Sequence, residues 1–320
     1  MIRFLLRRVG QSILVLFLSS LVVFGLFFVG PGPSQVARTF AGRLGTAARI
    51  AQIKHELHLD QPIYLQYSHW AWNLLHGNFG YDYYKGQSVS SVIAAAAPAT
   101  ISLVIGAAII WIVYGVFTGV VSAVRSRSFM DRAFTASALF FFSMPTFVLG
   151  LALVWIFAYK LSPVTTFFPF HGYVSITSDP AGWFQHLILP WLTLALVTAA
   201  SYTRLTRASM LEVLGEDYVR TARSKGMSEN RLITRHALRA ALTPVVTLAG
   251  LDIGISLGGV LIVETLFGVT GLGWTAIQAI NQQDLPIILG ITILATAFVV
   301  VANLIVDILY AVLDPRVRLY

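Results

Sequence analysis

The sequence predicts an all-α integral membrane protein with six transmembrane helices and both termini in the cytoplasm. Three observations carry this prediction: the composition, the length of the apolar segments and the distribution of positive charge. Of the 320 residues, 57% are apolar and 11% are charged, whereas a soluble domain is about 25% charged. The chain has too few charged side chains to cover a water-soluble surface, which places it in a bilayer.

Six segments are long and apolar enough to cross a membrane. A helix rises 1.5 Å per residue, so about 20 apolar residues span roughly 30 Å of hydrocarbon. The fourth segment reaches this length when it is counted from Trp183. The expected spans are Val9–Val29, Ile101–Val124, Ala133–Tyr159, Leu187–Tyr202, Pro244–Val263 and Ile287–Leu313.

The positive charges orient these spans, because cytoplasmic flanks retain Lys and Arg. With the N-terminus inside, most of the 22 lysines and arginines lie on the cytoplasmic side. The few on the outer side are Arg38, Arg43, Arg49, Lys54, Lys85 and Lys160. The net charge of +8 therefore follows from topology and anionic lipid, and nothing beyond it points to nucleic acid.

Residues 1–30 are expected to form an N-terminal transmembrane anchor helix. Arg3, Arg7 and Arg8 precede its apolar run, as positive charges do in a secretory signal. The run of about 20 residues exceeds the 7–15 residues of a signal core. We therefore expect this segment to be retained, with its positive charges on the cytoplasmic side.

Residues 31–98 are expected to form an extracytoplasmic loop region. Ala47–His58 has the pattern of a short amphipathic helix, and Pro62 stops its continuation. Tyr64–His76 is rich in Tyr and Trp. These aromatic residues are typical of a belt at the outer leaflet, and the alternative is a contact surface for a substrate-delivering partner.

Residues 99–313 are expected to form a five-helix core that contains a cytoplasmic loop at 203–243, followed by a cytoplasmic tail at 314–320. Within the loop, Tyr218–Leu242 is hydrophilic and cationic. Gly226 is suited to the left-handed conformation that ends a helix, and Ser228 to the N-cap of the next. This predicts a stiff helix–turn–helix that docks on another protein; the alternative is an ordinary solvated loop.

The fifth span contains a glycine stripe and a deep carboxylate. Gly250, Gly254 and Gly258 recur every four residues, the spacing of a close helix contact. At 100° per residue, Asp252 lies about 200° from Gly250 and faces elsewhere. A carboxylate facing lipid costs about 2.5–3.5 kcal/mol, so Asp252 is predicted to line a translocation path, or else to bond a neighbouring helix or be protonated. Asp307, near the inner end of the sixth span, is expected to snorkel or to pair with a loop arginine.

Other function classes lack their residues. The chain has no cysteine, and its seven histidines show no HExxH spacing, so disulfides, thiol-ligated metals and a zinc site are not expected. An intramembrane hydrolase would need a nucleophile and a base, yet no GxSxG occurs. A self-sufficient secondary transporter would show inverted repeats and a chain of buried ionisable groups, and only Asp252 is placed deep in a span.

The central loop resembles the EAA motif of ATP-binding-cassette (ABC) importer permeases, in the variant typical of the peptide and nickel permease family. The residues at the motif positions are Arg220, Thr221, Ala222, Lys225, Gly226, His236, Leu238 and Arg239. Further similarities follow along the whole chain, at Leu57–Pro62, Ser143–Phe147, Arg204–Met210, Glu264–Phe267, Gly271–Gly273 and Asp314–Arg316. This chain departs from the family pattern at His58, Asn78 and Thr270.

The resemblance implies a type I ABC importer permease fold and a pore for short peptides, or alternatively for nickel or another small solute. It implies as partners a second homologous permease, two cytoplasmic ATP-binding subunits and an extracytoplasmic substrate-binding protein. The motif residues would then be the ATPase-coupling residues. The chain itself would carry no catalytic residue and no cofactor, because ATP and Mg bind to the partner ATPases.

Overall fold

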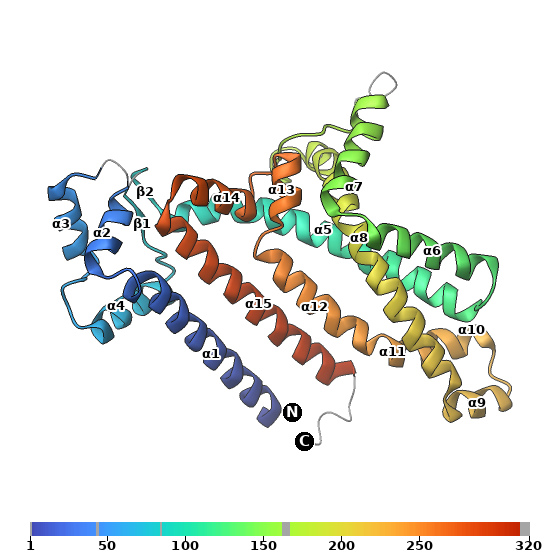
Figure 1. Cartoon of the computed structure of the whole chain (residues 1–320). Helices are drawn as coiled ribbons and strands as arrows, with labels where there is room; N and C mark the ends of the chain where they lie inside the picture. The colour runs from blue at the N-terminus through green and yellow to red at the C-terminus, as the bar shows by residue number, and fades with distance from the viewer. Residues whose placement is uncertain (1, 43–44, 84, 162–166, 314–320) are drawn as a thin grey trace.

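The structure is a computed structural model that describes residues 2–42, 45–83, 85–161 and 167–313. Almost all of its regular structure is helical (Figure 1), with one two-stranded antiparallel hairpin. In chain order the elements are α1 (Ile2–Phe24), α2 (Pro33–Ala41), α3 (Ala47–Glu56), α4 (Ile63–Leu75), β1 (Tyr81–Asp82), β2 (Gln87–Ser88), α5 (Val89–Val124), α6 (Phe129–Ser143), α7 (Thr146–Leu153), α8 (Pro180–Gly215), α9 (Asp217–Ser224), α10 (Glu229–Arg231), α11 (Leu238–Ala241), α12 (Thr243–Leu257), α13 (Leu261–Phe267), α14 (Leu272–Gln282) and α15 (Leu285–Leu313). Three π-helical segments extend or join them, at Gly25–Val29, Val154–Lys160 and Leu232–Ala237.

Among the described residues, four helices are long and apolar enough to cross a membrane by themselves. They are Leu6–Val29, Val89–Val124, Pro180–Gly215 and Leu285–Ile308. Three further helix pairs pass the same test only as bent pairs, so the chain has between four and seven candidate spans. The all-helical membrane fold is therefore present, while the number of spans depends on how the bent pairs lie in the bilayer.

Several boundaries differ from those expected. The expected third span is bent by 105° between Ser143 and Thr146, where Pro145 disfavours helical continuation of the residue before it. In the expected fifth span, helix α12 ends at Leu257, ahead of Gly259, whose φ is +122°. The helix of the expected second span, α5, begins at Val89, twelve residues before Ile101. Ser88 caps this helix by accepting a hydrogen bond from the Ser91 backbone N–H at 3.2 Å.

The central core is the crossing of α5 and α8. Gly115 and Gly119 let the two backbones approach, since a Cβ on Gly119 would lie 2.6 Å from the Thr206 Cβ. Thr118 and Thr203 exchange a hydrogen bond of 2.8 Å across the contact. The surrounding side chains are fully buried and apolar, including Leu103, Ala107, Trp111, Leu187, Ala195 and Tyr202. This closely packed pair forms the central frame of the molecule.

The glycine stripe of α12 faces α15. A Cβ on Gly254 would lie 2.8 Å from the Ala302 Cβ, and one on Gly258 would lie 3.0 Å from the Ala295 Cβ. A Cβ on Gly250 would overlap the Val306 side chain. The three glycines therefore lie at the place where α12 and α15 come closest.

The region expected to be the extracytoplasmic loop folds onto the C-terminal end of α1. The expected amphipathic helix is α3, and the aromatic segment is α4. Tyr67 and Trp70 of α4 pack on Phe24 of α1, at ring-centroid distances of 5.4 and 5.5 Å. Tyr64 and Trp72 stay 71% and 64% exposed. The aromatic segment is thus divided between a small core and a free face.

Two of the departures from the family pattern lie in this region. His58 stands where the family has glycine and adopts φ +53°, a conformation that glycine takes without steric cost. Asn78 stands where the family has aspartate, and its side-chain oxygen accepts the Gly80 backbone N–H at 3.0 Å. A carboxylate would accept the same bond, so the turn is kept.

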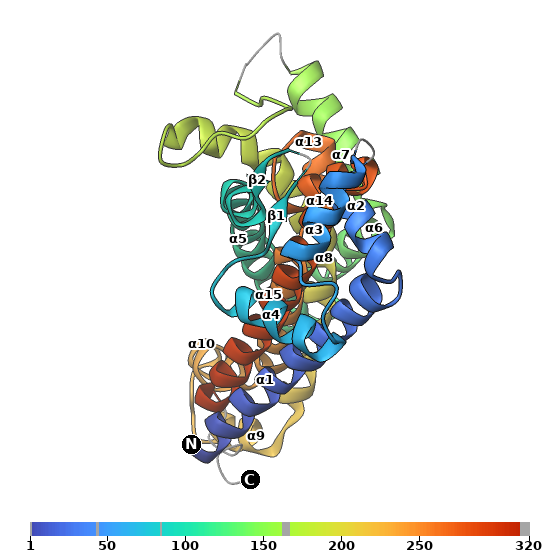
Figure 2. The same ribbon diagram turned by 90° about the vertical axis from the view of Figure 1, so that its left-hand side faces the viewer.

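Figures 1 and 2 place the beginning of α1, the end of α15 and the helices α9 and α10 at one end of the molecule. The helices α2 and α3, the hairpin and α14 lie at the opposite end. Arg8 of α1 pairs with Asp307 of α15 at 3.2 Å, so the partner of Asp307 is an anchor-helix arginine and not a loop arginine. The tail at 314–320 lies outside the described residues.

Candidate functional site

The central cationic segment forms two short helical arms around a tight turn. The first arm is α9, and the second is the continuous helical stretch from α10 to α11. Gly226 adopts φ +78° between them, as the sequence predicts. The Lys225 and Met227 backbone N–H groups donate to the Thr221 and Ala222 carbonyls, at 3.1 and 3.3 Å. The turn therefore satisfies the last carbonyls of the first arm.

An ion pair joins the two arms. The Arg223 Nε and Nη2 atoms donate to the two Glu229 carboxylate oxygens at 2.5 and 3.1 Å, and this hydrogen bonding holds the pKa of Glu229 below its usual value. Ser228 occupies the N-cap position, but its side chain makes no capping hydrogen bond. The expected N-cap position of Ser228 is therefore confirmed, while Glu229, and not the Ser228 hydroxyl, makes the polar contact between the arms.

The arms present one buried face and one exposed face. Val219, Leu232 and Ala237 are fully buried, and Ala237 packs with Ala123 of α5 and Met210 of α8. Of the predicted coupling residues, Ala222 and Leu238 are half-buried. The exposed ones are Arg220, Thr221, Lys225, Gly226, His236 and Arg239. The element is therefore anchored on the ends of α5 and α8 and directs its polar groups outward.

The loop that carries these arms is shorter than the range 203–243. Helix α8 continues to Gly215, so residues 203–215 belong to the long helix. Only Glu216, in an extended conformation, separates the end of α8 from α9.

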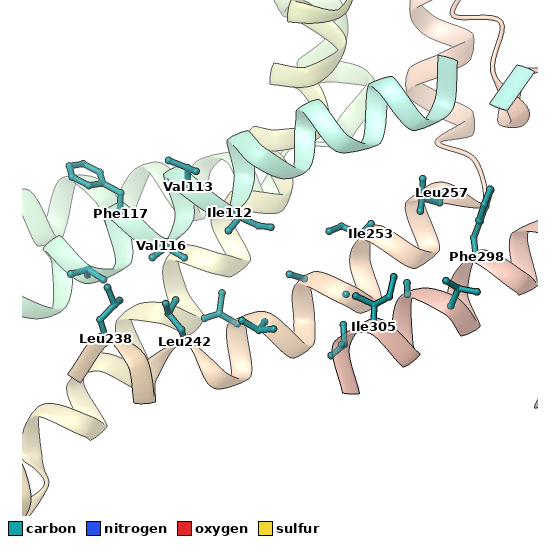
Figure 3. A pocket seen from close by; sticks show the side chains of 18 of the residues that line it. Ile112, Val113, Val116, Phe117, Leu238, Leu242, Ile253, Leu257, Phe298 and Ile305 are labelled. Atoms are coloured by element: carbon teal, nitrogen blue, oxygen red, sulfur yellow. The ribbon is translucent and has the colours of Figure 1, made fainter. Parts of the chain in front are cut away.

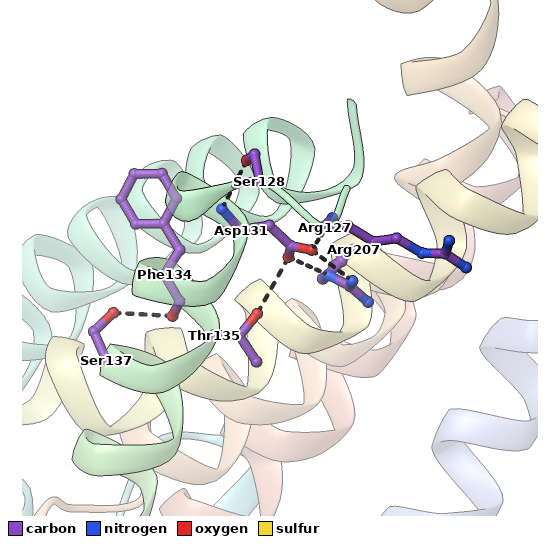
Figure 4. Close-up of polar contacts among 7 residues, drawn as sticks. All are labelled: Arg127, Ser128, Asp131, Phe134, Thr135, Ser137 and Arg207. Carbon is purple, nitrogen blue, oxygen red and sulfur yellow. Dashed lines mark hydrogen bonds and ion pairs between the residues drawn. The ribbon is translucent and has the colours of Figure 1, made fainter. Parts of the chain in front are cut away.

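A buried ion pair that the sequence analysis did not find fixes the C-terminal part of α8. The Arg207 Nε and Nη2 atoms donate to Asp131 Oδ1 and Oδ2 at 2.7 and 2.9 Å (Figure 4). The Arg127 backbone N–H donates to Asp131 Oδ2 at 2.8 Å, and Asp131 is 5% exposed. Asp131 thus joins the α5–α6 turn to the helix that leads to the two arms, Asp217–Ser224 and Glu229–Ala241, which are called the coupling arms below after their predicted role.

A second carboxylate, Glu264 on α13, is completely buried. The Thr100 hydroxyl donates to Glu264 Oε1 at 2.7 Å, and the Trp274 backbone N–H donates to Oε2 at 2.8 Å. The Leu272 backbone N–H donates to the same Thr100 oxygen at 2.8 Å. Glu264 therefore caps the N-terminus of α14 and links it to α5.

The glycines around Glu264 leave room for its carboxylate. A Cβ on Gly271 would lie 2.6 Å from Glu264 Oε1. The sequence analysis placed only Asp252 deep in a span and did not find Glu264, because the expected fifth span ends one residue before it. Glu264–Phe267 and Gly271–Gly273 resemble the family outside the EAA motif. This similarity was the signal that could have identified Glu264 as a functional residue.

Asp252 faces α8, and the glycine stripe faces α15. The Tyr202 hydroxyl donates to Asp252 Oδ2 at 2.8 Å, and Tyr202 is itself buried against Trp111. Asp252 is half-buried. The contact is the interhelical bond that the sequence analysis held as the alternative to a place on the translocation path.

An open groove of about 860 Å³ lies beside these helices, between α5, α11, α12 and α15 (Figure 3). Its lining is aliphatic and aromatic, with Val113, Phe117, Leu242 and Ile305 among the side chains. Asp252 does not line it, although Ala249 and Ile253 do. The lining side chains offer no hydrogen-bond partner to a peptide backbone, so the groove is suited to apolar contacts.

Among the described residues, no three His, Cys, Asp or Glu side chains come together as a metal site would require. The polar groups described above act instead on helix ends and helix contacts. Their arrangement fixes the geometry of helices and does not place a nucleophile beside a base.

Comparison with known proteins identifies the family. Residues 115–319 match the family described as the binding-protein-dependent transport system inner membrane component, and residues 1–104 match its N-terminal membrane component. A probable peptide ABC transporter permease of Sinorhizobium fredii is 39% identical, over 98% of this chain and 99% of the relative. A putative peptide transport system permease of Brucella abortus is 40% identical, over 98% of each chain.

A third relative, the dipeptide transport system permease DppB of Escherichia coli, is 36% identical over 99% of each chain. These similarities extend over the whole length and include both the spans and the cationic arms. The chain therefore belongs to the binding-protein-dependent transport system inner membrane component family and is a multi-pass protein of the cytoplasmic membrane.

Proposed function

We propose that this chain is one of two permease subunits that form the pore of an ABC importer for short peptides. The observation that carries this proposal is the rigid coupling element at Tyr218–Leu242, which is anchored on the ends of α5 and α8 and presents exposed polar residues. The names of the relatives, which specify peptide or dipeptide transport, support a peptide cargo. No relative named here supports nickel or another small solute, or a self-sufficient secondary transporter.

The proposed topology has six spans with both termini in the cytoplasm. The spans are α1, α5, the bent pair α6–α7, α8, α12 and α15, while α13 and α14 form a short helix pair at the outer side. The beginning of α1, the end of α15 and the coupling arms lie at one end of the molecule, which supports this arrangement. The excess of arginine at that end agrees with a cytoplasmic position.

In the proposed assembly, a second homologous permease completes the pore, and two cytoplasmic ATP-binding subunits supply the energy. A substrate-binding protein delivers peptide on the outer side. Arg220, Thr221, Lys225, Gly226, His236 and Arg239 form the contact with one ATPase, and Ala222 and Leu238 support it from behind. This chain performs no covalent chemistry and holds no cofactor, since ATP and Mg belong to the ATPases.

The assembly is tested by purifying the chain from its own cells in a gentle detergent and identifying by mass spectrometry the proteins that accompany it. We expect a second permease and one or two ATP-binding subunits. A chain that reproducibly purifies alone or as a homo-oligomer contradicts the proposal and supports a self-sufficient transporter.

Gly226→Asp is expected to reduce the recovery of ATP-binding subunits without reducing the recovery of the second permease. An aspartate at φ +78° is strained, and its negative charge changes a cationic surface. The same purification measures the effect. Gly226→Asn, which tolerates the left-handed conformation without adding charge, should have a smaller effect.

Gly86→Asp is the matched control, because Gly86 is also exposed at a positive φ of +70° but lies in the hairpin region at the opposite end. Equal loss of ATPase with both aspartate variants would mean that strain anywhere in the chain weakens the assembly. The coupling role of Gly226 would then be withdrawn.

Asp252→Asn is expected to alter the uptake of peptides while the complex still assembles. The change replaces the ionisable carboxyl beside the α8–α12 contact with a neutral amide but keeps an acceptor for the Tyr202 hydroxyl. Uptake of neutral, cationic and anionic dipeptides into proteoliposomes that contain the full complex measures it. Unchanged transport of every peptide, with normal assembly, would leave Asp252 as a helix-packing residue only.

A further inference from the structure

The turn between α5 and α6 carries three exposed arginines in eight residues: Arg125, Arg127 and Arg132. Arg125 contacts the Met130 sulfur at 2.9 Å. In the described part of the chain, no carboxylate pairs with any of these three guanidinium groups. The nearby acid, Asp131, is already occupied by Arg207.

The coupling arms contain both paired and unpaired cations, and those with no carboxylate partner among the described residues are Lys225, Arg231, Arg235 and Arg239. In the arms, Arg220 lies 3.7 Å from Asp217 and Arg223 pairs with Glu229. In the turn, the three positive charges have no such partner. They therefore form a local cationic surface that attracts an anion from outside the chain.

The turn is held in a fixed shape. Arg127 adopts φ +64°, a conformation that is costly for a residue with a side chain. Its backbone N–H is fixed by Asp131, and Ser128 accepts the Asp131 backbone N–H at 3.2 Å. Figure 4 shows the Arg127 side chain extending away from Asp131. The fold therefore maintains a strained backbone at the position that directs this guanidinium outward.

An apolar stripe begins at the same turn. Phe129 is 85% exposed, and Phe140 is 59% exposed. The exposed residues Phe129, Ala133, Ala136 and Phe140 recur at helical spacing, so they lie along one face of α6. An exposed phenylalanine beside arginines, at the end of an apolar helix face, is the arrangement of a site at the boundary between headgroups and acyl chains.

We propose that the α5–α6 turn binds the phosphodiester headgroup of an anionic phospholipid. The guanidinium groups of Arg125, Arg127 and Arg132 contact the phosphate, which matches their planar donors. The Phe129 side chain enters the acyl region, and the acyl chains continue along the exposed face of α6. A purely protein partner with an acidic surface would not require this apolar stripe.

Asp131 bonds both the backbone of this turn and Arg207 on α8. A lipid bound at the turn is therefore connected through Asp131 to the helix that leads to the coupling arms. The binding rests on the proposed topology, which puts the α5–α6 turn at the membrane surface, and does not depend on the coupling role or on the peptide cargo. Failure of the transport proposal would therefore leave this inference standing, and the reverse also holds.

The test is native mass spectrometry of the purified full chain, with its partners where they are retained, after exchange into micelles that contain equal amounts of phosphatidylglycerol and phosphatidylethanolamine. We expect preferential retention of phosphatidylglycerol. Each basic residue near an anionic surface contributes about fivefold in binding, so Arg125→Gln/Arg132→Gln should lower retention about 25-fold. The charge-matched control is Arg231→Gln/Arg235→Gln, at two exposed arginines of the coupling arms, and it should retain the lipid.

Arg127→Gly separates charge from folding, because glycine adopts φ +64° without strain. It should lose phosphatidylglycerol about fivefold while the thermal stability of the chain is kept or raised. Equal retention of the two lipids by the unaltered chain overturns the proposal. So does displacement of phosphatidylglycerol by free inorganic phosphate, which would indicate a soluble-anion site, or loss of ATP-binding subunits in place of lipid, which would indicate a protein contact.

Discussion

Glu264→Leu is expected to lower the free energy of unfolding by about 2–6 kcal/mol. The change removes the acceptor for the Thr100 hydroxyl and for the Trp274 backbone N–H, two donors in a completely buried site. Each buried donor left without a partner costs about 1–3 kcal/mol. Steric trapping of the chain in bicelles measures the free energy of unfolding.

Glu264→Gln is expected to cost less than the leucine change. Its amide oxygen still accepts the Trp274 N–H, and its amino group donates to the Thr100 oxygen, since a hydroxyl both donates and accepts. Glu212→Gln, at an exposed position of α8, is the control and should change stability by less than about 0.5 kcal/mol. A leucine variant as stable as the unaltered chain would show that Glu264 does not cap α14 in the membrane.

The second large effect is expected at the Asp131–Arg207 pair. Arg207→Gln should destabilise the chain by about 3 kcal/mol, because it leaves a buried carboxylate without its cation. The expectation is at the lower end of the range of about 3–5 kcal/mol for breaking a buried pair, since the Arg207 side chain is 31% exposed. The same unfolding measurement applies.

A double-mutant cycle separates the pair from its surroundings. Asp131→Asn combined with Arg207→Gln should be less destabilising than the sum of the two single changes, with a coupling of about 0.5–3 kcal/mol. Arg204→Gln is the control one turn earlier on α8, where the guanidinium lies 5.0 Å from the centre of the exposed Phe142 ring. Its expected cost is about 0.5–1 kcal/mol. Additive single changes would mean that the bidentate contact contributes no net stability.

These two sites have a common structural consequence. Glu264 fixes the short helix pair α13–α14 to α5, and Asp131 fixes the α5–α6 turn to the C-terminal part of α8. Both use a carboxylate to hold a helix terminus or turn against a long helix. The two carboxylates therefore act as clamps on the α5–α8 frame, and the helical arms at residues 217–241 extend beyond the Asp131 clamp.

The amino-acid sequence by itself determined the class of the protein and much of its local structure. Apolar length and positive charge predicted an all-helical membrane chain. Gly226 predicted the turn between the coupling arms, which has φ +78°. The four-residue spacing of Gly250, Gly254 and Gly258 predicted a close helix contact, and these glycines lie against α15. All of these features depend on residues that are near one another in the chain.

Only the tertiary structure decided the features that join distant segments. Thr100 and Glu264 are 164 positions apart, and Asp131 and Arg207 are 76 positions apart; no helical or turn periodicity relates such residues. The extension of α8 to Gly215 also depends on packing, since apolar length alone ends the span earlier. Hydrophobic periodicity reports which face of a helix is buried, whereas the pairing of buried polar groups depends on which helices meet there. For that physical reason the sequence predicted the helices and the coupling turn, and the fold alone determined the two carboxylate clamps.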